Sequence, residues 1–157
     1  MKHLAPRILL LAFAACLLLL WQAHRGPTIV MAQQPAPVML TRLYTGADNL
    51  THVEQLALKF SPVAGAPATS SQSDAIPSAN SYVVRLAPGF FQSWHNADKR
   101  RYVLTISGRA ELEIGAGQKI SIEPAQLILA EDLTGKGHTF RVLGDQPWVA
   151  LFVDFAQ

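Results

Sequence analysis

The stretch of sequence that decides the fold class covers residues 101–114 and reads RYVLTISGRAELEI. Gly108 divides it into two runs, and in the second run apolar residues alternate with charged ones. A period of two is typical of a β-strand with one buried face and one wet face. In the first run Tyr102, Leu104 and Ile106 resemble core residues more than Arg101, Val103 and Thr105 do, and the inward set of this run stays open.

Short strand patterns continue on both sides of this stretch, separated by glycine and proline. The turn signals lie at residues 88–89, 115–117, 124 and 144–147. Further strands are expected over residues 82–87, 119–123, 127–130, 139–143 and 148–155. Short strands at this spacing are typical of a sandwich or a barrel. After residue 33 the sequence shows no long helical period, so we expect an all-β fold.

The sequence before residue 82 has a different character. Residues 33–38 are rich in Pro and Gln, and residues 61–81 are rich in Pro, Ala, Ser and Gly. Between them, residues 42–46 and 56–60 have short strand patterns. We expect residues 33–81 to form an extended N-terminal arm and a long surface loop, and residues 82–157 to form the barrel.

Residues 1–32 have the pattern of a targeting segment. The apolar run Ile8 to Trp21 follows Lys2 and Arg7, and small residues precede a cleavage point after Ala32. The run is short for a membrane-spanning helix, which needs roughly 20 residues. We expect a signal peptide, with an uncleaved N-terminal membrane anchor as the alternative. The protein is then exported, to the periplasm or outside the cell.

Removal of this segment changes the charge of the chain. Ten basic and eleven acidic residues follow residue 32, so the net charge becomes −1 in place of +2. Such a domain lacks the basic excess of a nucleic-acid binder. The single cysteine, Cys16, lies in the apolar run. Residues 33–157 therefore have no disulfide, thiol nucleophile or thiolate metal ligand.

Two groups of residues resemble the motifs of the cupin superfamily. The spacing of the first cupin motif is matched by Gly89, His95, Ala97, Arg101 and Gly108. The spacing of the second motif is matched by Leu133, Gly135 and His138. The resemblance covers residues 82–155, and it implies the double-stranded β-helix barrel of a small, single-domain cupin.

The departures from the two motifs concern the metal ligands. A metal-binding cupin presents two histidines and a glutamate from the first motif and one histidine from the second. In this chain Ala97 occupies the second histidine position and Arg101 occupies the glutamate position. Zinc and iron sites generally have at least three protein ligands, and a guanidinium repels a dication. The metal-ligand positions are therefore degenerate.

Five residues are candidates for the site. His95 and His138 keep the motif positions and are expected to bind a ligand or a metal. Glu131 either completes a metal site with them, acts as a general base, or forms a salt bridge with Arg101. Arg101 is expected to hold an anionic ligand or to pair with a carboxylate. Trp94 either stacks on a ligand or packs with its neighbours.

Three functions remain open at this point. The first is a small-molecule-binding protein whose barrel cavity holds a small, anionic ligand through His95, His138 and Arg101. The second is a metal-dependent enzyme of dioxygenase or isomerase type with a divalent transition metal. The third is a structural or partner-binding protein of the cell envelope. A barrel with an exposed sheet edge also favours a homodimer. We expect membrane contact only through the N-terminal segment.

Overall fold

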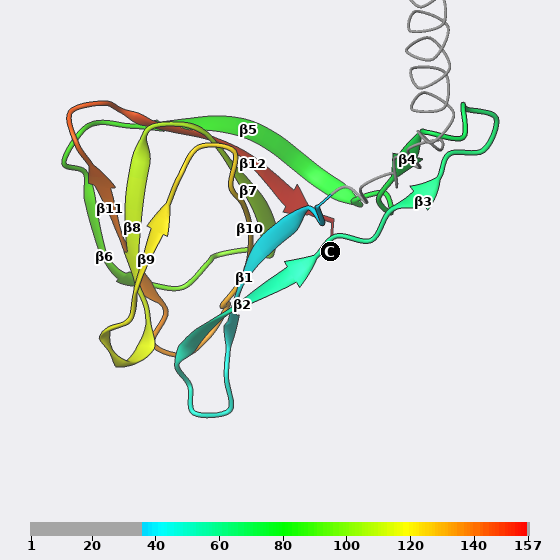
Figure 1. The fold of residues 1–157 in the computed structure, drawn as a ribbon. Coiled ribbons are helices and arrows are strands. Elements are labelled where there is room, and N and C mark those ends of the chain that lie inside the picture. The colour runs from blue at the N-terminus through cyan, green and yellow to red at the C-terminus, as the bar shows by residue number, and fades with distance from the viewer. Residues whose placement is uncertain (1–35, 157) are drawn as a thin grey trace, which may run out of the picture. The chain divides into compact units, whose positions relative to one another are not determined.

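The computed structural model describes residues 36–156, and this part of the chain is almost entirely β-strand (Figure 1). The strands are β1 (Met39–Thr45), β2 (Thr51–Ala57), β3 (Ser61–Pro62), β4 (Ser71–Gln72), β5 (Ser78–Leu86), β6 (Phe91–His95), β7 (Arg101–Ser107), β8 (Arg109–Glu113), β9 (Lys119–Ile122), β10 (Leu127–Glu131), β11 (His138–Leu143) and β12 (Trp148–Phe155). A single 3-10 turn, Gly115–Gly117, separates β8 from β9. The expected all-β fold is confirmed.

Two sheets make up the barrel. The larger sheet has the strand order β2-β1-β10-β7-β12-β5, and the smaller has the order β6-β11-β8-β9. Neighbouring strands are antiparallel except β1 and β10, which are parallel. Figure 1 shows the smaller sheet facing the larger one. Sheets that face each other in this way bury the inward side chains of both.

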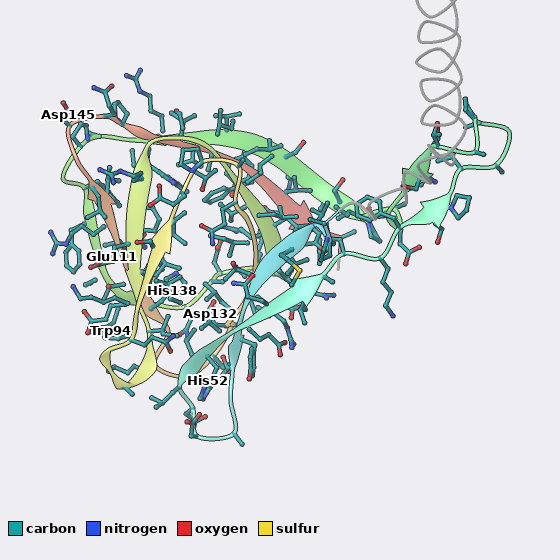
Figure 2. The ribbon with its side chains drawn as sticks, in the orientation of Figure 1. His52, Trp94, Glu111, Asp132, His138 and Asp145 are labelled. Atoms are coloured by element: carbon teal, nitrogen blue, oxygen red, sulfur yellow. The ribbon has the colours of Figure 1, made fainter. Side chains whose placement is uncertain are left out.

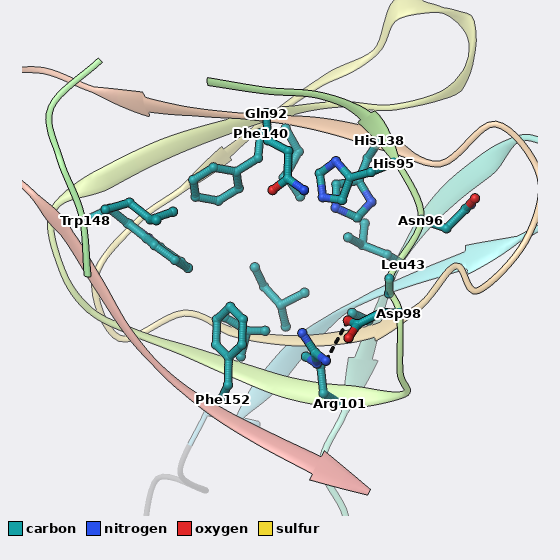
Figure 3. A pocket seen from close by; sticks show the side chains of 16 residues that line it. Leu43, Gln92, His95, Asn96, Asp98, Arg101, His138, Phe140, Trp148 and Phe152 are labelled. Atoms are coloured by element: carbon teal, nitrogen blue, oxygen red, sulfur yellow. Dashed lines mark ion pairs between the residues drawn. The ribbon is translucent and has the colours of Figure 1, made fainter. Parts of the chain in front are cut away.

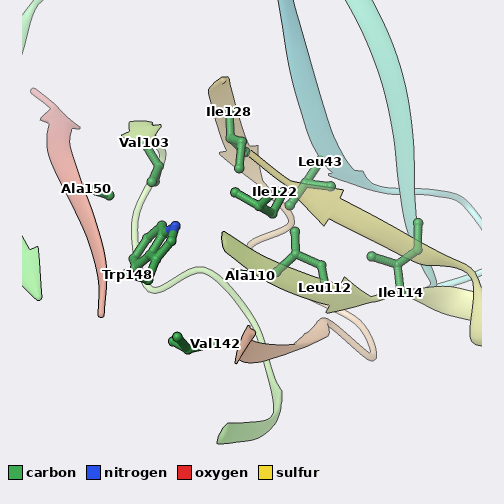
Figure 4. Packing of buried hydrophobic residues seen from close by; sticks show 10 residues of the cluster. All are labelled: Leu43, Val103, Ala110, Leu112, Ile114, Ile122, Ile128, Val142, Trp148 and Ala150. Atoms are coloured by element: carbon green, nitrogen blue, oxygen red, sulfur yellow. The ribbon is translucent and has the colours of Figure 1, made fainter. Parts of the chain in front are cut away.

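The core lies between the two sheets (Figure 4). Its buried side chains alternate along each strand with side chains that point outward. The larger sheet contributes Leu43, Val103, Ile128, Trp148 and Ala150. The smaller sheet contributes Ala110, Leu112, Ile122 and Val142. Trp148 is the largest fully buried side chain among the described residues.

The structure settles which residues of β7 face inward, and they are not the more apolar set. Arg101, Val103 and Thr105 are buried, whereas Leu104 is 37% exposed and Ile106 is 52% exposed. The outward residues of β7 are themselves apolar, so the more apolar set of residues did not mark the inner face. Arg101 faces inward because its charge is matched there by carboxylates.

The N-terminal segment belongs to the larger sheet. Strand β1 pairs along its length with β2 and in parallel with β10, with Leu43 opposite Ala130. The region 61–81, expected as a loop, contains the short β3–β4 pair, and β5 begins within it at Ser78. The arm is thus a structural part of the barrel. Strand β1 holds the end of β10, where Ala130 lines the cavity described below.

The segment expected as a signal peptide or anchor, residues 1–32, lies outside the described residues, as does Cys16. Between residues 36 and 156, no helix has the length and hydropathy needed to cross a membrane.

Candidate functional site

A cavity of about 280 Å³ lies between the two sheets. Its walls are mostly aliphatic and aromatic: Leu43, Leu86, Ala97, Val103, Leu112, Ile128, Ala130, Phe140, Trp148 and Phe152. Its polar lining residues are Gln92, His95, Asn96, Asp98, Arg101 and His138. Figure 3 shows the histidines and Arg101 toward one end and Trp148 toward the other. An apolar cavity with a few convergent polar groups is the usual form of a small-molecule site.

The two histidines of the cavity are held together by the sheet. His95 ends β6 and His138 begins β11, and the two residues are directly paired across the antiparallel strands. Cross-strand partners present their side chains on the same face. Their ring centroids are 4.4 Å apart, with an interplanar angle of 61°. The structure therefore brings together the two residues that the motif spacing selected.

Gly137 makes this close pairing of the strands possible. A Cβ at this position would lie 2.0 Å from the carbonyl oxygen of His95, and the residue has a φ of +75°. Only glycine combines that backbone conformation with so close an approach. The turn before β11 is thus built so that His138 lies directly against His95.

His95 is oriented by the main chain. Its Nδ1 donates a hydrogen bond to the carbonyl oxygen of Ser93 at 2.8 Å. Burial lowers the pKa of His95 below its ordinary value of 6.5, the Ser93 hydrogen bond opposes this, and His138 lowers it further. The imidazole is therefore neutral at pH 7, with Nε2 as its free acceptor.

His138 is oriented by a buried carboxylate. Its Nδ1 lies 2.5 Å from Oδ2 of Asp132, which also accepts a hydrogen bond of 3.0 Å from the Thr51 hydroxyl. Asp132 is fully buried, and its Oδ1 has no partner among the described residues. Figure 2 shows Asp132 and His138 in this part of the barrel. A carboxylate on Nδ1 fixes both the orientation and the tautomer of an imidazole.

Asp132 is a site residue that the sequence reasoning missed. Of the neighbours Glu131 and Asp132, Glu131 was the one expected to reach the site. Strand β10 ends at Glu131, so the alternation of strand side chains does not extend to Asp132. The available signal was the pair of glycines before His138, because the tight turn brings His138 back to Asp132.

Glu131 lies in an ion-pair network at the outer surface. Its carboxylate pairs with Arg42 Nε at 2.5 Å and with Arg100, and Arg42 also pairs with Glu54 at 2.6 Å. These hydrogen bonds, first that of Glu54 and then that of Glu131, raise the pKa of Arg42 above its ordinary value. The arginine partners of Glu131 are thus Arg42 and Arg100, and Arg101 pairs elsewhere.

Arg101 faces the cavity between two carboxylates. Its Nη2 is 2.6 Å from Asp98, and its Nε is 2.9 Å from Oδ1 of Asp154, an ion-pair distance without hydrogen-bond alignment. Lys99 lies 3.6 Å from the other oxygen of Asp154. The guanidinium also lies 5.2 Å from the centroid of the Phe152 ring. Asp98 and Asp154 were not foreseen, and they balance the charge of Arg101.

Trp94 lies outside the cavity lining. It is 38% exposed, and Nζ of Lys136 lies 3.9 Å above its ring. Phe90 and Phe91 on the same edge of the smaller sheet are exposed as well. His52 also lies outside the cavity lining; it is partly exposed and pairs with Asp48 at 2.9 Å (Figure 2).

The donor set does not fit the divalent metal that the resemblance implies. In residues 36–156, no group of three or more His, Cys, Asp or Glu residues is arranged to hold a metal ion. His95 and His138 offer two nitrogens, whereas Glu131 is bound by arginines and Asp132 is bound by His138. A protein site for zinc or iron generally needs three ligands. We derive no reaction step through a metal.

Comparisons with known proteins found similar solved structures but no matching protein-family model and no matching curated protein. Among solved structures the chain is similar to the cupin domain of Cnp3 from Schizosaccharomyces pombe, at 13% identity over 77% of this chain and 84% of that one, with a TM-score of 0.42.

Two further structures are similar to the chain. One is a Cupin_2 domain of an XRE family transcriptional regulator from Enterobacter cloacae, at 21% identity over 49% of this chain and 81% of that one, with a TM-score of 0.36. The other is a protein from Neisseria meningitidis, at 10% identity over 48% and 72%, with a TM-score of 0.36. Cupin domains are thus among the structures that the chain resembles, as the motifs predicted. These likenesses say nothing of a ligand or a reaction.

Proposed function

We propose that the protein binds a small molecule in the cavity between its two sheets. The observation that carries this proposal is the cavity itself, which has apolar walls and polar groups gathered toward one end. His95, His138 and Arg101 supply those polar groups, and Phe140 and Trp148 supply aromatic wall. The apolar body of a ligand would be buried against the walls, and the polar groups would fix its orientation.

Two alternatives have less support. A metal-dependent enzyme would need a third ligand beside His95 and His138, and no such group is found among the described residues. A purely structural barrel would be filled, with its histidines at the surface, whereas His138 is 8% exposed and lines a cavity. The proposal includes export of the protein, which rests on the pattern of residues 1–32.

A screen of single-ring molecules, each with one polar group, tests this function. Binding to the full-length protein would be detected by saturation-transfer NMR of the ligands. Ala97 lines the cavity in the segment after β6, so Ala97→Phe should reduce the volume and abolish binding of the hits. Ala68, an exposed loop residue, supplies the control Ala68→Phe, which should bind them normally. Hits that bind both variants equally would place the site elsewhere.

A further inference from the structure

We propose that the ligand of this cavity is a hydrogen-bond donor, an O–H or N–H group on an apolar body, received by the Nε2 atoms of His95 and His138. This inference rests on the proposed function and names the class of its ligand. It replaces the anionic ligand that the presence of Arg101 first suggested.

The first step is the tautomer of His95. A main-chain carbonyl oxygen can only accept a hydrogen bond, so the contact of 2.8 Å between Ser93 O and His95 Nδ1 places the proton on Nδ1. A neutral imidazole carries one donor and one acceptor. Nε2 of His95 is therefore a lone-pair acceptor. This atom has no hydrogen-bond partner among the described residues. It is also not buried, so a ligand can reach it.

The second step is the tautomer of His138. An ionised carboxylate also only accepts, so Asp132 Oδ2 holds the proton of His138 on Nδ1. The Thr51 hydroxyl donates to the same oxygen, which keeps the carboxylate in place. In its neutral form His138 therefore has an acceptor at Nε2. The cross-strand pairing then sets two imidazole acceptors side by side in the cavity wall.

The third step is the charge around Arg101. Asp98 and Asp154 both lie within ion-pair distance of its guanidinium, so one positive charge meets two negative charges. Lys99 offsets Asp154 from 3.6 Å. An anionic ligand placed against Arg101 would also approach these carboxylates, and like charges repel. The cavity therefore lacks the surplus of positive charge that an anion site needs.

The fourth step is the shape of the wall. Phe140 and Trp148 meet edge to face with ring centroids 4.8 Å apart, and Trp148 meets Phe152 at 6.2 Å. Aromatic side chains in this arrangement can pack against the ring of an aromatic ligand, either stacked or edge to face. Together with a volume of about 280 Å³, this wall suits a single aromatic ring that carries a hydroxyl group.

Three probes with the same ring separate the ligand classes. They are 4-methylphenol, 1,4-dimethylbenzene and 4-methylbenzoate, which place a donor, a methyl group and an anion at one position. Their dissociation constants for the full-length protein would be measured by ligand-observed NMR at pH 8, where the phenol is neutral and the lowered pKa of His95 keeps its imidazole neutral. We expect the phenol to bind at least about fivefold more tightly than either of the others, because only it satisfies the imidazole acceptors.

Each outcome decides something. Equal binding of the phenol and the dimethylbenzene, or tightest binding of the benzoate, would overturn the donor class and leave the cavity as a binding site. Absence of binding by all three at millimolar concentration would overturn both the donor class and the proposed function for single-ring ligands.

A pair of variants assigns the preference to the histidines. His95→Phe keeps a ring but removes the acceptor, and it should reduce the preference for 4-methylphenol over 1,4-dimethylbenzene to less than about twofold. His52→Phe changes a partly exposed histidine outside the cavity and should leave the preference intact. Retention of the full preference in His95→Phe would overturn the role of His95. The wild-type comparison stands even if a variant fails to fold.

Discussion

At the scale of single residues, the site is organised by carboxylates. Asp132 holds His138, while Asp98 and Asp154 hold Arg101. Motif spacing was sufficient to select His95, His138 and Arg101 from the sequence. Their carboxylate partners could not be selected, because the pairing of Arg101 with Asp154 depends on the register of β7 against β12.

The pairing of Arg101 gives a prediction for stability. Arg101→Met should lower the free energy of unfolding by about 3 kcal/mol, because it leaves the buried Asp154 carboxylate with only the distant Lys99. Urea unfolding measures this. The matched control is Lys119→Met, which removes an exposed partner of Glu111 and should change stability far less. Equal losses in the two variants would contradict the burial argument.

His95 gives a prediction for pH. Burial lowers the folded-state pKa of His95 below the unfolded value of 6.5. As the pH falls, the folded state therefore binds fewer protons than the unfolded state does. The contribution of His95 to stability is fully present above pH 6.5 and is lost as the pH falls through the lowered pKa. Unfolding by urea between pH 8 and pH 5 should show this loss in the wild type. His95→Phe should show less of it, and identical pH profiles would contradict the assignment.

At the scale of strands and turns, the alternating patterns predicted the elements better than their orientation. The runs at 109–113 and 119–122 are strands as expected. The inward face of β7 could not be chosen from the sequence because the outward residues Leu104 and Ile106 are apolar as well. A period of two shows that the faces differ, but it does not tell which face is inside when both carry apolar residues.

The turn before β11 gives a prediction at this scale. Gly137→Ala should destabilise the protein and weaken ligand binding, because the added Cβ would force His95 and His138 apart. Gly89 has the same positive φ with no atom within 4 Å of its Cβ position, so Gly89→Ala should cost only the backbone strain of about 1 kcal/mol. Thermal unfolding of both variants compares the two effects. A larger loss in Gly89→Ala would contradict the role given to Gly137.

At the scale of the whole molecule, β5 is an edge strand of the larger sheet. Among residues 36–156 it pairs with β12 on one side only, and it carries no charge from Ser78 to Val84. An edge strand of nine residues whose first seven carry no charge is a template for pairing with another chain. We therefore propose that the protein forms a homodimer through β5.

Val83 supplies the test of this homodimer. Its side chain is 61% exposed on the outer face of β5, so Val83→Lys should leave the fold intact and place two positive charges at the paired edges. Sedimentation velocity should then show a dimer for the wild type and a monomer for the variant. A monomeric wild type at micromolar concentration would contradict the proposal.

The most direct test of the binding cavity uses the tryptophans as reporters. Trp148 is 2% exposed and lines the cavity, whereas Trp94 is exposed beneath Lys136 and lies outside it. The measurement is the titration of ¹⁵N-labelled protein with 4-methylphenol, followed through the indole N–H resonances. We predict that the Trp148 resonance shifts in a saturable way while the Trp94 resonance stays in place. A saturable shift of Trp94 with an unmoved Trp148 would contradict a binding site between the sheets.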